Sequence, residues 1–257
     1  MSLNTIETWF LWLMIYSILG WIYESSLCSV SGKKFINRGF LNGPYCPIYG
    51  YGALLVILIL GRIKNPVVLF VLGALVTCSL EYFTSYLMEK LFHARWWDYT
   101  NRRFNINGRI CLIGAIVFGA FSVFLVLILQ PIIVSFTDLF SPVAKHIITI
   151  VLFVVFATDC AVTISGFAGF HKKLEELSAF FEQQKSAATD YINSLESNMQ
   201  QKERRLALKK KLNLQQRRML AAFPAFKMHK PHYNKTLEKL RIALKNAKKT
   251  YKPNSDK

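Results

Sequence analysis

EKLFHARWWDYTNRRFNINGRICLI, residues 89–113, is a polar stretch between two long apolar segments, and it decides how the chain is built. It holds carboxylates, an imidazole, two adjacent tryptophans and four arginines. A plain connecting loop does not need this chemistry. We therefore expect this stretch, held at a membrane surface by the rest of the chain, to be a ligand site, a catalytic site or only a lock between helices.

The rest of the N-terminal part of the chain is apolar enough to be embedded in a bilayer. Hydrophobic residues make up 53% of the 257 residues, and they are gathered into blocks. A helix of about 20 mostly apolar residues spans a bilayer. We therefore predict an all-α polytopic membrane protein with five transmembrane helices, at residues 5–30, 44–61, 67–91, 110–136 and 144–170. The first is not a cleavable signal, because no Lys or Arg precedes it.

The basic residues between these segments predict the orientation, since Lys and Arg are retained in cytoplasmic loops. Two alternate loops are rich in them, and the other two are poor. The rich loops carry Lys33, Lys34 and Arg38, then Arg95, Arg102, Arg103 and Arg109, whereas the poor loops carry Arg62 and Lys64, then Lys145. We expect a protein of the cell membrane with its N-terminus outside and its C-terminus in the cytoplasm.

Charge separates a second region from the first. Residues 1–170 contain 11 Lys and Arg against 7 Asp and Glu, whereas residues 171–257 contain 21 against 8. We predict a transmembrane domain at 1–170 and a cytoplasmic basic helical tail at 171–257. Below an anionic leaflet such a tail would bind lipid headgroups, although solubility alone also explains its charge. No nucleic-acid reading module accompanies it, so we expect no nucleic acid.

Helical periodicity subdivides the tail. Apolar residues follow helical spacing from 174 to 206, but Gln184 and Lys202 fall on the same stripe, which argues against a long regular coiled coil. A basic amphipathic helix is predicted from 202 to 218. Prolines end it, and a second basic helix is predicted from 232 to 251.

The two basic loops share a pattern. Asn37, Arg38, Phe40, Asn42, Gly43, Cys46 and Ile48 recur as Asn101, Arg102, Phe104, Asn107, Gly108, Cys111 and Ile113, with one residue inserted. Glu24 and Glu89 stand at comparable places upstream. We interpret this as two parallel helix-loop-helix repeats related by an axis along the membrane normal, an arrangement in which transporter sites lie between repeats.

Two acids lie inside apolar segments, Glu81 in the third and Asp159 in the fifth. Acids in hydrocarbon are costly and face the bundle. One hypothesis is that each acid lies on a transport pathway or binds a charged partner. The other is that each is protonated and stabilises the bundle through a hydrogen bond to a neighbouring Ser, Thr or Tyr.

Arg38 and Arg102, at equivalent repeat positions, would suit a bidentate phosphate or carboxylate ligand. Ion pairs with Glu24 and Glu89 explain them equally well. Glu89 and His93 are four residues apart and would share a helix face, but no second His follows, so we predict no metal and no other cofactor.

Trp96 and Trp97 are more simply a headgroup-level anchor than a stacking platform. The candidate ligand-binding residues are Glu24, Asn37, Arg38, Asn42, Glu89, His93, Trp97, Asp98, Asn101, Arg102, Asn107 and Arg109.

At NRGFLNGPYCPIYGYGA, residues 37–53, and LEYFTSYLMEKLFHARWWDYTNRRFNINGRICL, residues 80–112, the chain resembles the bacterial Putative ABC-transporter type IV family. The resemblance covers residues 10–170. It implies a multi-pass plasma-membrane permease. The chain has no GxxxxGK[ST] motif, so an ATPase would be a separate subunit.

The residues leave other functions open. A membrane scaffold or regulator with a lipid- or partner-binding tail is one, and a lipid-modifying membrane enzyme is another. No GxSxG or HExxH motif is present and the acids name no reaction, so an enzyme is the less favoured class. The sequence names no substrate and no coupling ion, and it is compatible with a monomer or a homo-oligomer.

Overall fold

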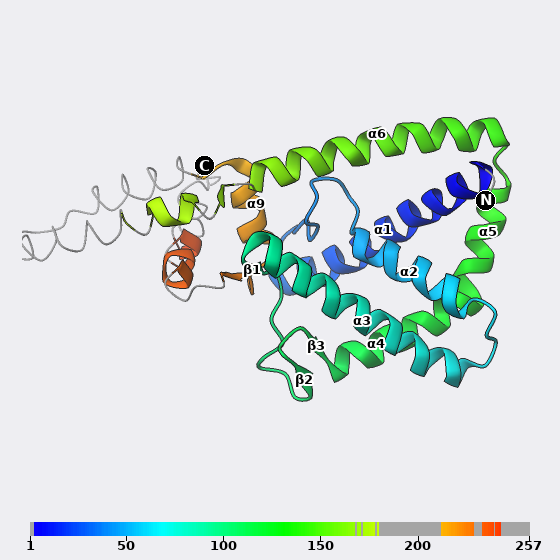
Figure 1. The fold of residues 1–257 in the computed structure, drawn as a ribbon, viewed down its shortest axis with the longest axis horizontal. Helices are drawn as coiled ribbons and strands as arrows, with labels where there is room; N and C mark the ends of the chain where they lie inside the picture. The colour runs from blue at the N-terminus through cyan, green and yellow to red at the C-terminus, as the bar shows by residue number, and fades with distance from the viewer. Residues whose placement is uncertain are drawn as a thin grey trace, which may run out of the picture. The chain divides into compact units, whose positions relative to one another are not determined.

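The computed structural model describes residues 3–167, 169–170, 172–177, 179, 212–228, 233–238 and 240–242 (Figure 1). Its helices are α1 (Leu3–Gly32), α2 (Pro47–Leu60), α3 (Pro66–Phe92), α4 (Leu112–Phe124), α5 (Gln130–Asp138), α6 (Pro142–Phe167) and α9 (Leu214–Ala222), with a π-helical turn η1 (Leu125–Leu129) between α4 and α5. Two short antiparallel pairs join β1 (Ala94–Arg95) to β4 (Lys227–Met228) and β2 (Asn105–Ile106) to β3 (Ile110–Cys111).

Four helices are long and apolar enough to cross a membrane: α1, α3, the continuous helix α4–η1–α5, and the helix that begins at Pro142. Their apolar side chains are largely exposed, as Val151, Phe153 and Val154 on α6 illustrate, which suits contact with lipid. The 14 residues of α2 extend about 21 Å at 1.5 Å per residue, less than the roughly 30 Å of hydrocarbon. The all-α prediction is confirmed, with four candidate membrane helices, and the fifth span stays a prediction.

Local sequence fixes where three of these helices begin. Proline occupies the first helical position of α2, α3 and α6, where its missing N–H costs nothing. Before α3, Asn65 Oδ1 accepts hydrogen bonds from the backbone N–H groups of Val67 and Val68, at 2.9 and 3.1 Å. Before α6, the Ser141 hydroxyl accepts one from Ala144 N–H at 3.2 Å. These side chains satisfy amides that the first helical turn leaves without partners.

The π turn η1 ends two residues before Pro131, which removes one backbone donor from the helix. Gln130 N–H bonds to the carbonyl of Leu125, five residues back, so the wider turn absorbs the irregularity. The side chain of Gln130 accepts a hydrogen bond from the Tyr16 hydroxyl. One turn apart on α1, Trp12 donates to Thr137 at 3.2 Å. These two bonds attach α5 to α1.

α1 and α2 lie side by side because glycines allow their backbones to approach. A Cβ atom on Gly20 would lie 2.4 Å from the Cβ of Tyr49, and one on Gly50 would lie 2.5 Å from the carbonyl oxygen of Leu13. Both distances are too short for atoms that do not bond. Small residues serve in this way at helix contacts inside membranes, where apolar burial does not drive association.

Glycines also mark the contact of α3 with α4. A Cβ atom on Gly73 would lie 2.3 Å from that of Ser122, and one on Gly119 would lie 2.9 Å from the carbonyl oxygen of Phe70. Each of the two consecutive helix pairs is therefore held close through a glycine on each partner.

The chain divides into two compact units, Met1–Met88 with Trp97–Thr163, and Glu89–Trp96 with Ile164–Lys257. The first contains the candidate membrane helices except for the ends of α3 and α6. The independent domains predicted at 1–170 and 171–257 stay a prediction.

An aromatic core holds the second unit together. Trp96 is 3% exposed, and its ring centre lies 4.6 Å from that of Phe226, 5.1 Å from Phe167 and 5.6 Å from Phe92. The Arg241 guanidinium donates to the Phe226 carbonyl at 2.7 Å. The interpretation of Trp96 as a headgroup anchor is therefore wrong, because the C-terminal residues 223–228 cover the ring.

The tail predictions are only partly within the described residues. Asn213 caps α9: its side chain accepts from Gln216 N–H, and the Gln216 side chain accepts from Asn213 N–H. This capping box starts a new helix, so a single helix from 202 to 218 is wrong. Residues 233–238 and 240–242 are helical. The coiled coil, the residues before 212 and the end of the second basic helix lie outside the described residues.

The glycine contacts give a first prediction. Gly50→Ala should destabilise the protein by about 1–3 kcal/mol, because the methyl group collides with the α1 backbone. Gly52→Ala is the matched control, since a Cβ there would meet only the Leu80 side chain at 3.5 Å, and alanine favours the helix. Unfolding of the purified protein in detergent would measure both variants. Equal loss of stability would contradict the packing described for α1 and α2.

Candidate functional site

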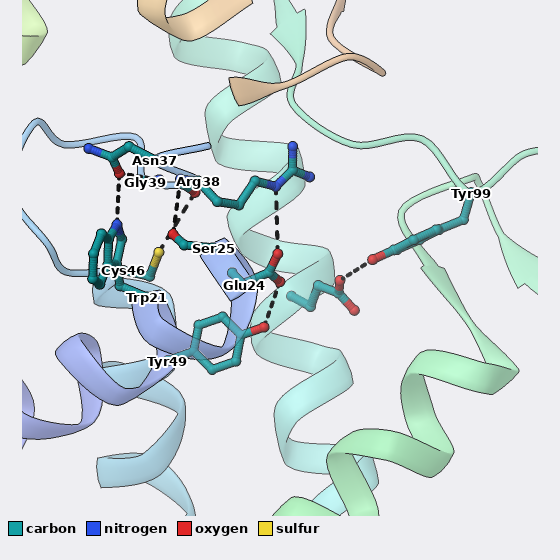
Figure 2. Close-up of polar contacts among 10 residues, drawn as sticks. Trp21, Glu24, Ser25, Asn37, Arg38, Gly39, Cys46, Tyr49 and Tyr99 are labelled. Atoms are coloured by element: carbon teal, nitrogen blue, oxygen red, sulfur yellow. Dashed lines mark hydrogen bonds and ion pairs between the residues drawn. The ribbon is translucent and has the colours of Figure 1, made fainter. Parts of the chain in front are cut away.

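Glu24, near the end of α1, has an ordered polar environment in the first unit (Figure 2). Arg38 Nε lies 3.5 Å from Glu24 Oε2, and the Tyr49 hydroxyl of α2 donates to Glu24 Oε1 at 2.6 Å. The side chains of Glu24 and Arg38 are 31% and 18% exposed. The ion pair that the sequence suggested for these two residues is therefore present, together with a tyrosine that the sequence analysis missed.

The loop after α1 is tied back to that helix, and this positions Arg38. The Ser25 hydroxyl accepts from Arg38 N–H at 3.2 Å, and Asn37 Oδ1 accepts from the Trp21 indole at 2.7 Å. The other end of the Asn37 amide donates to the Asn42 carbonyl at 3.0 Å. Asn37 thus orders the loop.

Asp159 of α6 anchors the same loop farther along. Its Oδ1 accepts from Asn42 N–H and Nδ2, at 3.1 and 2.9 Å, and from the Thr163 hydroxyl at 3.1 Å. Its Oδ2 accepts from Gly43 N–H at 2.7 Å and from the Tyr45 hydroxyl at 2.6 Å. All five contacts are donors, which favours a charged carboxylate over a protonated acid.

Glu81 of α3 is the more buried of the two acids inside apolar segments, at 7% exposed. Its Oε1 accepts from the Tyr99 hydroxyl at 3.3 Å, whereas Oε2 is buried with no hydrogen-bond partner among the described residues. Burial raises the pKa of Tyr99 well above its ordinary value, and the negative charges of Glu81 and Glu24 act in the same direction. The charges of both carboxylates thus act on this phenol.

The turn that carries Tyr99 is held by backbone and side-chain bonds of the first unit. Tyr99 N–H donates to the Gly108 carbonyl at 2.8 Å, and the Trp97 indole donates to the Arg109 carbonyl at 3.0 Å. Gly108 has φ +66°, and a Cβ there would lie 2.6 Å from Thr100. A side chain at position 108 would therefore disrupt the turn.

Arg109 is 9% exposed and lies over two aromatic rings of α3. Its guanidinium carbon is 5.4 Å from the ring centre of Tyr82 and 5.6 Å from that of Tyr86, within the range of cation–π attraction. Asn107 donates to the Tyr82 hydroxyl at 2.9 Å. Both residues hold the turn against α3.

The remaining predicted residues are dispersed. Asp98 Oδ1 accepts from Thr100 N–H at 3.0 Å, which is a local turn bond, and Asn101 and Arg102 are exposed. In the second unit, Glu89 pairs with Arg95 at 3.1 Å, and His93 is exposed. Glu89 therefore takes a different arginine from the one that the repeat pattern suggested. Among the described residues no group of three or more His, Cys, Asp or Glu could hold a metal ion.

The structure thus joins Glu24, Arg38 and Glu81, and adds Tyr49 and Tyr99. The two tyrosines carried no signal in the sequence, because one lies on a predicted apolar span and the other in the polar loop beside more conspicuous residues.

Apolar helices with an ordered polar cluster are typical of membrane proteins that handle polar ligands. The chain belongs to the family described as Putative ABC-transporter type IV, whose model matches residues 11–164, more than half of the chain. No curated protein and no solved structure matches it.

The Asp159 contacts generate a second prediction. Asp159→Asn should lower stability by about 2 kcal/mol, because it replaces a charged acceptor and turns one oxygen into a donor facing other donors. Hydrogen exchange should accelerate at the amides of Asn42 and Gly43. Asp138→Asn is the matched control, as the Asp138 side chain is 64% exposed. Unchanged exchange at residues 42 and 43 would show that Asp159 does not hold the loop.

Proposed function

We propose that this protein is the permease subunit of an ABC-type transporter in a bacterial cytoplasmic membrane and works with a separate ATPase. Membership of the transporter family and the four candidate membrane helices support this proposal. The polar cluster of Glu24, Arg38, Tyr49, Glu81 and Tyr99 is its ligand site. The cluster faces the cytoplasmic end of the bundle.

The proposed topology has five spans, with α2 as the shortest. Irregular backbone is tolerated at membrane depth only where protein or water satisfies its amides. The segment before α2 meets this condition: Asp159 accepts from the N–H groups of Asn42 and Gly43, and the Ser17 carbonyl accepts from Cys46 N–H at 2.8 Å. A 14-residue helix preceded by such a segment is suited to cross the hydrocarbon.

Two features favour the parallel repeats. Cys46 and Cys111, which correspond in the repeat pattern, are the N-cap residues of α2 and α4. The pairs α1–α2 and α3–α4 are each closely packed through glycines. Exposed basic residues occur in both loops: Lys33 and Lys34 follow α1, and Arg102 lies in the loop after α3. Their positive charge favours a cytoplasmic side for both loops.

The observation that carries the ligand site is the pairing of Glu24 with Arg38 and Tyr49 next to a second carboxylate. An acid held by one arginine and one tyrosine is fixed in orientation before any ligand arrives. The cluster draws on α1, α2, α3 and both basic loops, so a ligand bound there would be sensitive to movement between the two repeats. This is the coupling that a permease requires.

Transport by an Arg38→Gln variant tests the proposal. In a deletion strain screened for uptake or export of candidate substrates, this change should reduce transport at least about tenfold, since a charge-assisted contact of about 1.5–3 kcal/mol is lost. Arg62→Gln, at an exposed position between α2 and α3, should leave transport unchanged. Equal transport by wild type and Arg38→Gln for every responsive substrate would contradict the assigned site.

A scaffold or regulator is the second candidate, favoured by the folded aromatic core that residues 212–228 build around Trp96. Deleting residues 171–257 would remove Phe223 and Phe226 from that core, so truncation would confuse folding with function.

Neutralising Lys209, Lys210 and Lys211 to Gln separates the two functions. A scaffold that docks through its basic tail should lose activity in complementation of the deletion strain, whereas the permease should retain it. Matched substitution of Lys245, Lys248 and Lys249 tests whether the effect depends on position or on charge alone. Loss of activity with Lys209, Lys210 and Lys211 only would favour the docking function.

A further inference from the structure

No positive charge among the described residues is seen to compensate the carboxylate of Glu81. Its side chain is more than nine-tenths buried, and its Oε2 has no hydrogen-bond partner among them. Glu24, the charged residue that acts on it, is another carboxylate. A buried charge without compensation is strongly unfavourable, so the site requires a positive charge beyond those that the described residues supply.

The amount of charge needed follows from the pairing in the cluster. Arg38 compensates Glu24 through their ion pair, which leaves the charge of Glu81 alone. Two carboxylates with one arginine therefore carry one net negative charge. This amount matches a single monovalent cation.

The available donors also suit such an ion. The described groups that act on Glu81 offer oxygen: its own Oε2, the hydroxyl of Tyr99 and the carboxylate of Glu24, which the Tyr49 hydroxyl contacts in turn. Each tyrosine uses its proton on a carboxylate and keeps lone pairs for another partner. Hard cations select oxygen ligands. Among the described residues, the Cys78 thiol also lies in the field of Glu81, and the Cys111 thiol acts on Tyr99.

We propose that Glu81, together with Tyr99 and Glu24, binds one exchangeable monovalent cation, either an alkali ion or a proton, inside the first unit. The inference rests on the proposed function for its use, since the ion would be the coupled or co-bound charge of the permease. Binding itself does not require transport. A binding experiment can therefore fail while the transport test succeeds, and the reverse.

The first experiment measures thermal unfolding of the purified full-length protein in detergent. Sodium, potassium or lithium chloride is titrated against N-methylglucamine chloride at constant ionic strength and pH. We expect a saturable rise in Tm with at least one alkali ion. Glu81→Gln should lose this rise and keep its fold, because it removes the uncompensated charge. Glu176→Gln, at an exposed position of the second unit, should behave as wild type.

Tyr99→Phe provides a second variant that leaves the acid in place. Loss of one oxygen ligand should raise the half-saturating cation concentration roughly fivefold, the equivalent of one modest polar contact. This measurement remains informative if Glu81→Gln is poorly folded.

Infrared difference spectroscopy distinguishes the two sources of charge. If the proton is the occupant, alkali ions leave Tm unchanged, and wild type shows a carboxylic-acid C=O band that responds to pH and is absent in Glu81→Gln. That result supports the proton form of the proposal. An alkali response that persists in Glu81→Gln would overturn the proposal. The absence of both an alkali response and a band that depends on Glu81 would also overturn it.

Discussion

The first unit depends on one constraint: backbone amides that leave a helix inside an apolar environment must still find acceptors. The segment before α2 is irregular because prolines and glycines interrupt it, and it meets the constraint by bonding to two helices. Ser17 of α1 provides a carbonyl, and Asp159 of α6 provides a carboxylate that accepts five hydrogen bonds. The position of Arg38, at the start of this loop, follows from the same network through Ser25.

Asp159 and Glu81 show how two acids in apolar helices come to differ. Asp159 is surrounded by donors and is satisfied within the chain. Glu81 has one long hydrogen bond, a buried second oxygen and another carboxylate nearby. Since hydrocarbon imposes the same penalty on both, the difference lies in their partners. The acid with an incomplete set of donors is therefore the better candidate for a ligand.

The second unit is built by a different force. Phe92, Trp96 and Phe167 come from the ends of helices α3 and α6, whereas Phe223 and Phe226 follow α9. Aromatic rings of this size bury large areas and prefer tilted or edge contacts. The basic character of the C-terminal region concealed this core, because Lys and Arg dominate its composition while its buried positions are few.

Sequence alone determined the apolar segments, the family, and the candidate status of Glu24, Arg38 and Glu81. These properties depend on composition and on contacts between near neighbours, so they can be read along the chain. Tertiary structure decided that Glu24 is near Tyr49, that Glu81 is near Tyr99, that Glu89 pairs with Arg95, and that Trp96 is buried. Except for Glu89 with Arg95, these outcomes join residues far apart in sequence. The relevant spacing is then set by helix packing and loop geometry, and no local pattern encodes it.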